Sequence, residues 1–245
     1  MMISGWPAKY NKILKEFNFN KKSDEESASL LEEMIKENNQ VEKLEKIIKN
    51  QIVFVVGSGP SLSKSIPYLK NFKKTIKIVA DSAVKPIVEN GIKPDVVVTD
   101  LDGDLKVLKK IGKTKTIFVV HAHGDNIKKL DFVKNFKNFL GTTQSKPFGK
   151  LFNFGGFTDG DRGVFLANYF QAKKIILFGM DFGDKIGKYS DTKPKERKIK
   201  LKKLRMGKHL LEWLSSKSKV ELFTTSDPIS GFKKIKYKDL DIIIT

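Results

Sequence analysis

The chain has 245 residues, and it contains neither cysteine nor any long apolar run. Without cysteine, disulfide bonds and thiolate metal sites are excluded, so a metal ion would need oxygen or imidazole ligands. No apolar stretch approaches the roughly 18 residues that a membrane-spanning helix requires. The first residues, MMISGWPAKYNK, lack the apolar core of a secretory signal peptide. We therefore expect no membrane partner and a cytoplasmic location.

Acidic residues are few relative to basic ones: 28 Asp and Glu stand against 47 Lys and Arg, a formal net charge of +19. The excess is partly local. Residues 1–50 carry nine lysines and nine acids, whereas residues 185–219 carry thirteen basic residues and three acids, a net of +10. A surface adapted to high temperature would spread its charge evenly. The basic segment therefore favours a polyanionic partner, either a nucleic acid or a small molecule.

Aromatic residues help to choose between these partners. From Lys185 to Lys208 the only aromatic residue is Tyr189, although surfaces that bind single-stranded nucleic acids interleave aromatic and basic side chains. Nucleic-acid binding is therefore the weaker interpretation. We expect a lid whose cations, Lys195 and Arg197 among them, close over a triphosphate. A solvated helical face is the alternative.

The chain divides near residue 50. Residues 1–50 have helical periodicity, with Ser23 and Glu26 at capping-box spacing, and we expect this segment to pack on a main catalytic domain, residues 51–245. There, short runs of Val, Ile and Phe alternate with amphipathic stretches. The expected strands are 52–56, 76–80, 95–99, 116–120, 174–178 and 219–223. The expected helices are 62–71, 83–90, 104–111, 126–137, 160–171 and 196–216.

Apolar strands that alternate with helices predict an α/β fold: a doubly wound, mostly parallel, Rossmann-like sheet with an N-terminal helical extension. In such sheets, ligands bind beyond the carboxyl ends of the strands. Polar or glycine-rich residues follow most of the expected strands, and those positions contain the candidate site residues.

The first strand ends in a glycine-rich turn formed by Gly57, Ser58 and Gly59. Glycines let backbone N–H groups approach a phosphate at a helix N-terminus, so we expect these three residues to bind a nucleotide phosphate. The turn is half of a dinucleotide fingerprint, without its third glycine, and it is not a Walker loop. An ordinary tight turn is the alternative.

An acidic run, Asp100, Asp102 and Asp104, follows the third strand. Alternate residues of an extended chain face the same side, so these carboxylates can converge. Clustered carboxylates repel one another unless a cation lies among them, and oxygen ligands suit Mg²⁺. We expect Asp100 and Asp102 to bind the metal, and Asp104 to cap the next helix.

Two further motifs follow. His121, His123 and Asp125, with Asn126, come after the fourth strand and could supply a transition-metal site, acid–base groups, phosphate donors or only a helix cap. The segment GGFTDGDRG at 155–163 opens another helix. Its Asp161 could be a cap and Arg162 could bind an anion, although an Arg beside acids is more often a surface pair.

Taken in order, the motifs resemble the archaeal-type 6-hydroxymethyl-7,8-dihydropterin pyrophosphokinases. The motifs that carry the resemblance are GSGPSL at 57–62, ADS at 80–82, PDVVVTDLDGD at 94–104, HAHGDN at 121–126, GFTDGDR at 156–162 and FGMDFG at 178–183. Part of the set also looks like thiamine pyrophosphokinase, with matches at Asp81, residues 94–95 and residues 100–102. Ser82, however, stands where thiamine enzymes have glycine, and the histidine-rich run is not theirs. The pterin family is therefore the better match.

The resemblance implies that ATP donates its β,γ-diphosphoryl group to the hydroxymethyl group of a reduced pterin, leaving AMP. Mg²⁺ on Asp100 and Asp102 would be the cofactor, and the product would serve the biosynthesis of a folate-type cofactor such as tetrahydromethanopterin. Asp81 or Asp125 would complete the metal site or hold the substrate hydroxyl. The two histidines would handle protons or contact phosphate. ATP and the pterin are the implied partners, and the oligomeric state is left open.

Three alternatives remain at this point. Thiamine could be the acceptor. An Asp-x-Asp at a strand end also serves Mg²⁺-bound sugar nucleotides, so a nucleotide-sugar transferase is the second. The third is a basic nucleic-acid-binding protein without catalysis, which leaves the acidic run unexplained.

Overall fold

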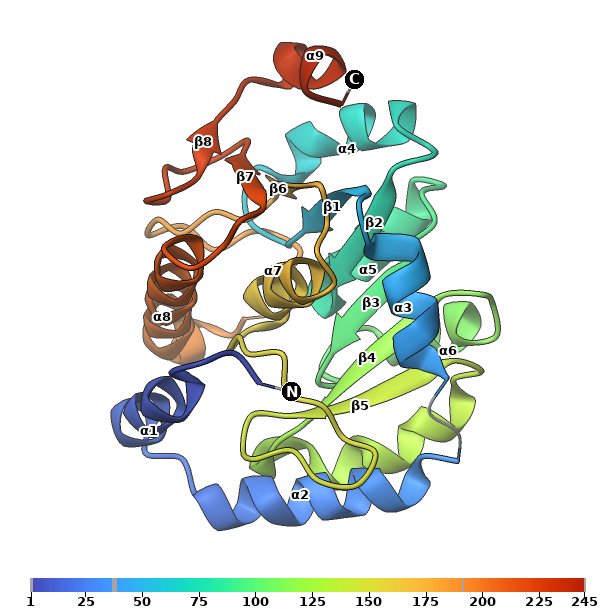
Figure 1. Ribbon diagram of the computed structural model, residues 1–245, viewed down its shortest axis with the longest axis vertical. Helices are drawn as coiled ribbons and strands as arrows, with labels where there is room; N and C mark the ends of the chain where they lie inside the picture. Colours follow the sequence, from blue (N-terminus) through green and yellow to red (C-terminus); the bar gives the residue numbers. More distant parts are fainter. Residues whose placement is uncertain (1, 37–38, 191, 245) are drawn as a thin grey trace.

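A single eight-stranded parallel sheet forms the centre of the protein (Figure 1). The computed structural model describes residues 2–36, 39–190 and 192–244. The strand order across the sheet is β5-β4-β3-β2-β1-β6-β7-β8. The strands are β1 (Ile52–Val56), β2 (Ile76–Ala80), β3 (Val96–Thr99), β4 (Ile117–Ala122), β5 (Phe139–Thr143), β6 (Lys174–Phe178), β7 (Glu221–Thr224) and β8 (Lys233–Lys234).

The chain winds outward in two directions from the middle of the sheet. From β1 it runs through β2 to β5 toward one edge, and it then returns to β6 beside β1 and continues through β7 to the other edge. The order of strands therefore reverses between β1 and β6, which makes the crevice beyond their carboxyl ends the expected ligand site. The predicted doubly wound α/β fold is confirmed, and all strand pairs are parallel.

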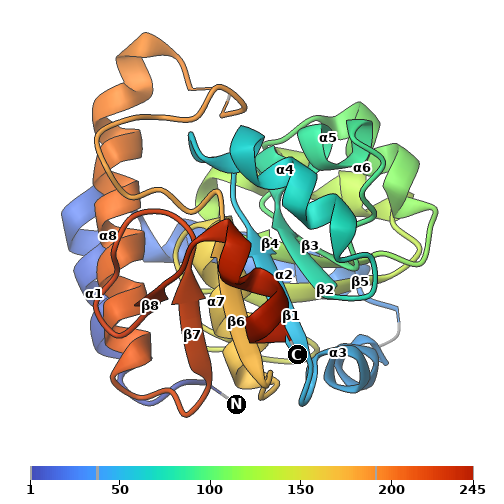
Figure 2. The same ribbon diagram turned by 90° about the horizontal axis from the view of Figure 1, so that it is seen from above.

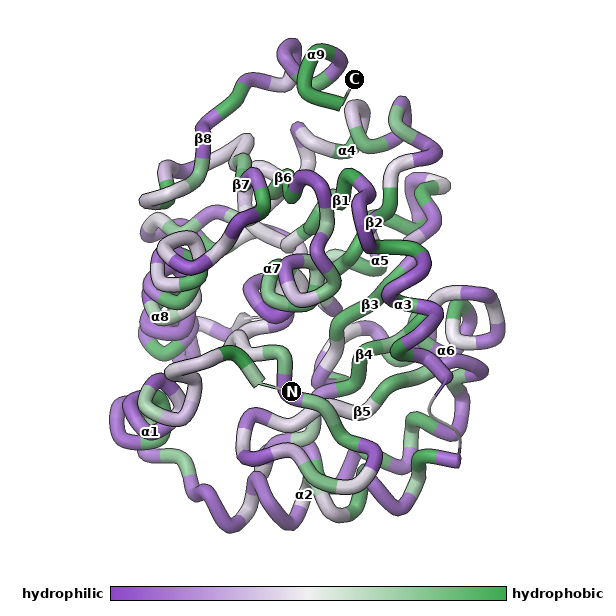
Figure 3. Tube along the Cα trace, in the orientation of Figure 1, coloured by the Kyte–Doolittle hydropathy of each residue, from purple (hydrophilic) through white to green (hydrophobic). Residues whose placement is uncertain are grey.

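Successive residues of each central strand belong to different cores, because side chains alternate between the two faces of a sheet. Val53 and Val55 of β1 pack on one face, whereas Phe54 and Val56 pack on the other. This burial on both faces explains why the strands are apolar throughout, as the green course of the central strands in Figure 3 shows.

Helices cover both faces. The first face is packed by α1 (Trp6–Phe17), α3 (Gln40–Ile48), α7 (Asp159–Tyr169) and α8 (Arg197–Ser215). The second is packed by α2 (Lys21–Met34), α4 (Leu62–Asn71), α5 (Asp81–Glu89), α6 (Leu105–Gly112), the 3-10 helix η1 (Gly124–Asn135) and α9 (Leu240–Ile244). Seen from above, α1 and α8 lie on one side of the molecule and α5 and α6 on the other (Figure 2). Two short 3-10 helices, η2 (Pro194–Glu196) and η3 (Tyr237–Asp239), complete the elements.

The N-terminal segment shares the core of the sheet domain. Trp6 and Ile13 of α1 are fully enclosed in the first core, and Leu31 of α2 is enclosed in the second. Buried Asp24 of α2 accepts hydrogen bonds from the Tyr10 hydroxyl at 2.7 Å and from the Gly124 N–H at 2.9 Å. The segment therefore fixes the loop after β4 as well as covering the sheet.

Several predicted details were wrong. The capping box at Ser23 is absent, because α2 already begins at Lys21. Its N-cap is Asn20, whose side chain accepts the Lys22 N–H at 2.9 Å. The helix expected at 126–137 is the 3-10 helix η1. Strands β5 and β8 were not predicted. Within the described part of the chain, no helix is long and apolar enough to cross a membrane.

Candidate active site

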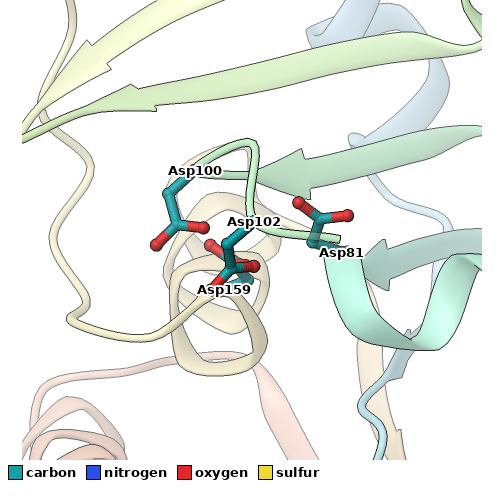
Figure 4. Close-up of side chains that lie close together, drawn as sticks. All are labelled: Asp81, Asp100, Asp102 and Asp159. Atoms are coloured by element: carbon teal, nitrogen blue, oxygen red, sulfur yellow. The ribbon is translucent and has the colours of Figure 1, made fainter. Parts of the chain in front are cut away.

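Four aspartates converge at the carboxyl edge of the sheet. Asp81 follows β2, Asp100 and Asp102 follow β3, and Asp159 begins α7. One carboxylate oxygen from each lies within 4.8 Å of those of the other three. Figure 4 shows the four side chains pointing toward one another from three separate segments. We refer to these residues as the aspartate cluster.

Asp81 is almost fully buried, with 1% of its surface exposed, and hydrogen bonds fix one of its two carboxylate oxygens. Its Oδ2 accepts hydrogen bonds from the Thr99 hydroxyl and from the Gly103 N–H, the latter at 3.2 Å. Its Oδ1 is buried and has no hydrogen-bond partner among the described residues. Burial raises the pKa of Asp81 to about 7, and the neighbouring Asp102 and Asp100 add to this effect.

The loop that carries Asp100 and Asp102 turns sharply at Leu101. Leu101 has a φ of 66°, in the left-handed region that a side chain disfavours. Its side chain is nevertheless fully buried in the second core, and its N–H donates to the Thr99 hydroxyl at 2.8 Å. Packing therefore maintains a strained backbone at this point. This turn, and not the regular alternation of an extended chain, brings the flanking carboxylates together.

Two side chains from the segment after β4 fix Asp100. His123 Nδ1 accepts the Asp125 N–H at 3.2 Å, so its Nε2 carries the hydrogen and donates to Asp100 Oδ2 at 3.2 Å. Asn126 donates to the backbone carbonyls of Asp100 and His121 at 2.9 and 2.7 Å. The HAHGDN motif therefore supports the loop that carries Asp100 and Asp102.

The electrostatic environments of the clustered carboxyls differ, and so do their pKa values. Burial opposes ionisation of Asp100, but the hydrogen bond from His123 and the nearby Arg162 charge outweigh it and hold the Asp100 pKa well below its usual range. Burial and the charge of Asp100 raise the pKa of Asp102 to about 6. Burial, with the charge of Asp100, raises the pKa of Asp159 well above its usual value. Several of these groups thus resist ionisation until a cation compensates them.

The aspartate cluster fits a hard divalent cation such as Mg²⁺. The donor set is entirely carboxylate oxygen, which Mg²⁺ prefers. Asp81 Oδ1 and Asp100 Oδ1 are buried without a hydrogen-bond partner in the described structure, and a buried unpaired carboxylate oxygen is costly unless a cation or donor reaches it. The residues present therefore suit the metal that the sequence predicted.

The aspartate cluster lies in the wall of a cavity of about 690 Å³, the main cavity, which extends across the β1–β6 switch point. The lining of the main cavity is also rich in basic side chains. Five lysines line the cavity: Lys85, Lys185, Lys188, Lys200 and Lys203. Ser58 and Ser82 also line it, and their hydroxyls are 2.7 Å apart. A cavity lined both by a carboxylate cluster that fits a divalent cation and by several lysines suits a polyphosphate.

The glycine turn borders the main cavity, but its backbone is already engaged. The N–H of Gly57 donates to Phe178 O, and that of Gly59 donates to Gly179 O, both at 2.8 Å. The expectation that these two N–H groups are directed at a phosphate is therefore not met in this structure. Ser58, between them, lines the cavity.

The remaining predicted residues lie around the cavity wall or outside it. Asp161 is fully buried and accepts hydrogen bonds from the N–H groups of Phe157 and Thr158 at 2.6 and 2.8 Å, so it caps α7. The Asp125 carboxylate is 73% exposed. Lys195 and Arg197 are exposed and absent from the described lining of the main cavity.

Arg162 and His121 lie behind the aspartate cluster. Arg162 is 8% exposed, and its Nη1 donates to Asp159 Oδ1 at 3.3 Å. His121 is 2% exposed, and burial, with the Arg162 charge, lowers its pKa well below its usual value. Neither residue lines the main cavity within the described structure.

Sequence reasoning missed Asp159, Lys200 and Lys203. Asp159 directly follows Thr158, the N-cap of α7, and at the sheet edge an acid in the first helical turn is a ligand candidate as well as a helix-dipole partner. The two lysines lie on α8, three residues apart and thus on one helix face.

Comparison with known proteins gives a consistent result. The family model described as 6-hydroxymethylpterin diphosphokinase MptE-like matches residues 27–187. This chain belongs to that family. A 6-hydroxymethyl-7,8-dihydropterin pyrophosphokinase of Methanocaldococcus jannaschii is 45% identical over 239 residues, which cover 90% of this chain and 99% of the relative. Proteins with the same name from Pyrococcus furiosus and Methanothermobacter thermautotrophicus are 41% and 36% identical, over 90% and 91% of this chain and 97% and 99% of those relatives.

Among solved structures, the MAf glycosyltransferase from Magnetospirillum magneticum AMB-1 matches with a TM-score of 0.60 at 15% identity. The match covers 86% of this chain and 39% of that one. At this identity the likeness concerns the fold alone.

Proposed function

We propose that this protein transfers the β,γ-diphosphoryl group of ATP to the hydroxymethyl group of 6-hydroxymethyl-7,8-dihydropterin, with Mg²⁺ as cofactor, and releases AMP. The new bond joins the pterin oxygen to the β-phosphorus, and the bond from that phosphorus to the α,β-bridging oxygen breaks. The product would enter folate-type cofactor synthesis, for example of tetrahydromethanopterin, in the cytoplasm. The names of the relatives supply the acceptor and the reaction class.

The observation that carries the proposal is the presence of the aspartate cluster and five lysines in the lining of one 690 Å³ cavity. A triphosphate needs cations along its length, and a transferred diphosphoryl group must be held at both ends. In this arrangement Lys200 and Lys203 of α8 bind the outer phosphates, and Lys185 and Lys188 neutralise the charge that moves to AMP.

Within the aspartate cluster we assign the metal to Asp100 and Asp102, with Asp159 as a third ligand. Bound Mg²⁺ would neutralise the phosphate oxygens and lower the barrier to attack on phosphorus. His123 holds Asp100 ionised and correctly oriented through its Nε2 donation. Asp81 Oδ1 has no partner in the described structure and a raised pKa, so we assign it to accept the hydroxyl hydrogen of the acceptor alcohol.

The proposal is tested by offering the purified protein ATP and Mg²⁺ with one alcohol at a time: the hydroxymethyl dihydropterin or thiamine. We expect AMP and a diphosphorylated product with the pterin only. Product formation with thiamine alone would show that thiamine is the acceptor, and the proposed reaction class would still hold. Absence of AMP with either alcohol, under conditions where the M. jannaschii relative is active, would contradict the proposal.

A further inference from the structure

A second, much smaller space lies behind the aspartate cluster. This space, which we call the small chamber, has a volume of about 10 Å³, and it is lined by side chains that include His121, Thr142 and Arg162. Gly156 forms part of its wall with a φ of 90°, and a Cβ there would come within 2.6 Å of the Arg162 Cα. The backbone can pass this close to Arg162 only because residue 156 is glycine.

Two polar atoms of the residues around the small chamber are buried without a hydrogen-bond partner in the described structure: His121 Nε2 and Arg162 Nε. Their residues are 2% and 8% exposed. Unpaired buried polar atoms are rare and costly, and two of them on residues that line one small chamber imply that something connects them.

The hydrogen bonds of Thr142 define which ring nitrogen of His121 carries a hydrogen. The single hydroxyl hydrogen of Thr142 goes to the Val120 carbonyl at 3.0 Å, so the Thr142 oxygen must accept from His121 Nδ1–H at 3.2 Å. Burial and the Arg162 charge lower the pKa of His121 well below its usual value, so the ring is neutral and its Nε2 is an acceptor without a hydrogen. Arg162 Nε–H is only a donor. A single water can accept from Arg162 and donate to His121, and the chamber volume is about that of one water.

We infer that the small chamber holds one ordered water that links His121 to Arg162, and that this link makes His121 a positioning residue for the metal site. Arg162 connects the chamber to the aspartate cluster, because its Nη1 donates to Asp159 Oδ1 at 3.3 Å. Fixing the Nε side of the guanidinium fixes the direction of Nη1 and hence the Asp159 carboxylate. His121 thus acts through water and Arg162, and not on the substrate.

The hydration site itself rests on geometry alone, whereas its effect on Mg²⁺ rests on the proposed function. The first can be tested without any assay of activity. The chain has three histidines, so long-range ¹H–¹⁵N spectra of the imidazole nitrogens can be assigned with single His→Gln variants. We expect His121 at pH 7 to carry its hydrogen on Nδ1, and a high-resolution crystal structure to show one water bonded to His121 and Arg162. The Nε2–H tautomer, a dry chamber or a direct His121–Arg162 bond would overturn the inference.

The positioning role is tested by Mg²⁺ titration of the full chain in a calorimeter. His121→Leu removes the acceptor and should weaken Mg²⁺ binding about tenfold, as removal of an outer-shell partner of a metal ligand typically does. His121→Gln retains an acceptor oxygen and should restore most of the affinity. Thr116→Val is the matched control. Thr116 directly precedes β4, and its buried hydroxyl donates to Pro94 O, at the end of the strand opposite to His121.

Val119→Ile offers a second route, because it fills the chamber with a methylene and leaves both polar residues in place. We expect it to weaken Mg²⁺ binding as His121→Leu does. Unchanged affinity in both variants, or an equal loss in Thr116→Val, would refute the positioning role. If wild-type protein binds Mg²⁺ normally but makes no pterin diphosphate, only the proposed function is contradicted. The hydration site is then still tested by the spectra and the crystal structure.

Discussion

Gly103 lies directly against the carboxylate of Asp81, so closely that a Cβ at position 103 would come within 1.9 Å of Asp81 Oδ1. Gly103 also donates its N–H to the other oxygen of the same carboxylate at 3.2 Å. The glycine of the TDLDGD segment is therefore required to make room for Asp81.

This relationship predicts that Gly103→Ala displaces Asp81 and lowers turnover by about 100-fold or more, since a positioned general base contributes about 10²- to 10⁴-fold. The free energy of unfolding should fall by about 1–3 kcal/mol through overpacking. Steady-state kinetics and urea unfolding measure the two effects.

Gly91→Ala is the control for this substitution. Gly91 has a φ of 74° and open space around it, so alanine there strains the backbone without touching the site. It should lose stability but keep its activity. Normal turnover in Gly103→Ala would show that Asp81 is not needed where the structure places it.

The stability of the metal-free protein should depend on pH through Asp81 and Asp102. Burial raises their pKa values to about 7 and about 6, from a usual 3.8. A carboxyl with a raised pKa binds its proton more tightly in the folded state, so its contribution to stability is complete below about pH 4 and is lost as the pH rises through 6 and 7.

Urea unfolding in EDTA should therefore give a lower free energy of unfolding at pH 8 than at pH 5, and Mg²⁺ should remove most of the difference. Asp81→Asn should be more stable than wild type at pH 8 in EDTA and should show no such gain at pH 5. A variant that is less stable at both values would contradict the assigned charge repulsion.

The metal ligands should matter for turnover more than for folding. Asp100→Asn or Asp102→Asn should abolish turnover. Without metal, Asp102→Asn should keep or slightly raise the melting temperature, because repulsion with Asp100 is relieved. Asp100→Asn should lower it somewhat, because His123 and Arg162 stabilise the ionised Asp100 in the folded state. Asp104→Asn is the comparison: Asp104 caps α6 by accepting the Lys106 and Val107 N–H groups at 3.1 Å, so its loss should cost about 1 kcal/mol or less. Near-normal turnover of either cluster variant at ordinary Mg²⁺ would exclude it as a ligand.

The basic segment should bind ATP through its cavity-facing lysines. Lys200→Gln with Lys203→Gln should raise the KM for ATP about tenfold or more, since a charge-assisted phosphate contact contributes about 1.5 kcal/mol, and should weaken its dependence on salt. Lys195→Gln with Lys198→Gln removes the same charge from exposed positions and should have little effect. Equal effects of the two pairs would indicate a general charge effect in place of specific contacts.

The sequence predicted the central strands well because burial on both faces requires uninterrupted apolar runs. It did not predict β5, because Gly141, Thr142 and Thr143 interrupt the apolar pattern. The Asp100 and Asp102 pair was found by its position after β3, but the mechanism of its convergence was not, since nothing in the residue pattern reveals that Leu101 adopts a positive φ.

Other site residues depend on tertiary contacts that no local pattern encodes. Asp159 is distant in sequence from Asp100 and lies close to it only because α7 packs on the first face of the sheet. Asp161 and Arg162 follow Asp159 by two and three residues, yet Asp161 caps the helix and Arg162 donates a hydrogen bond to the Asp159 carboxylate. Which of three charged neighbours faces the cavity is decided by the rotation of α7, which spacing alone does not fix.

The transfer of the β-phosphorus is the central claim, because a kinase and a pyrophosphokinase both require Mg²⁺ and a triphosphate site. It is tested most directly with ATP labelled at the β-phosphorus, Mg²⁺ and the hydroxymethyl dihydropterin. We predict that the label moves to the pterin and that unlabelled AMP forms in equal amount. Stoichiometric ADP, or label that stays wholly with the nucleotide, would contradict this account.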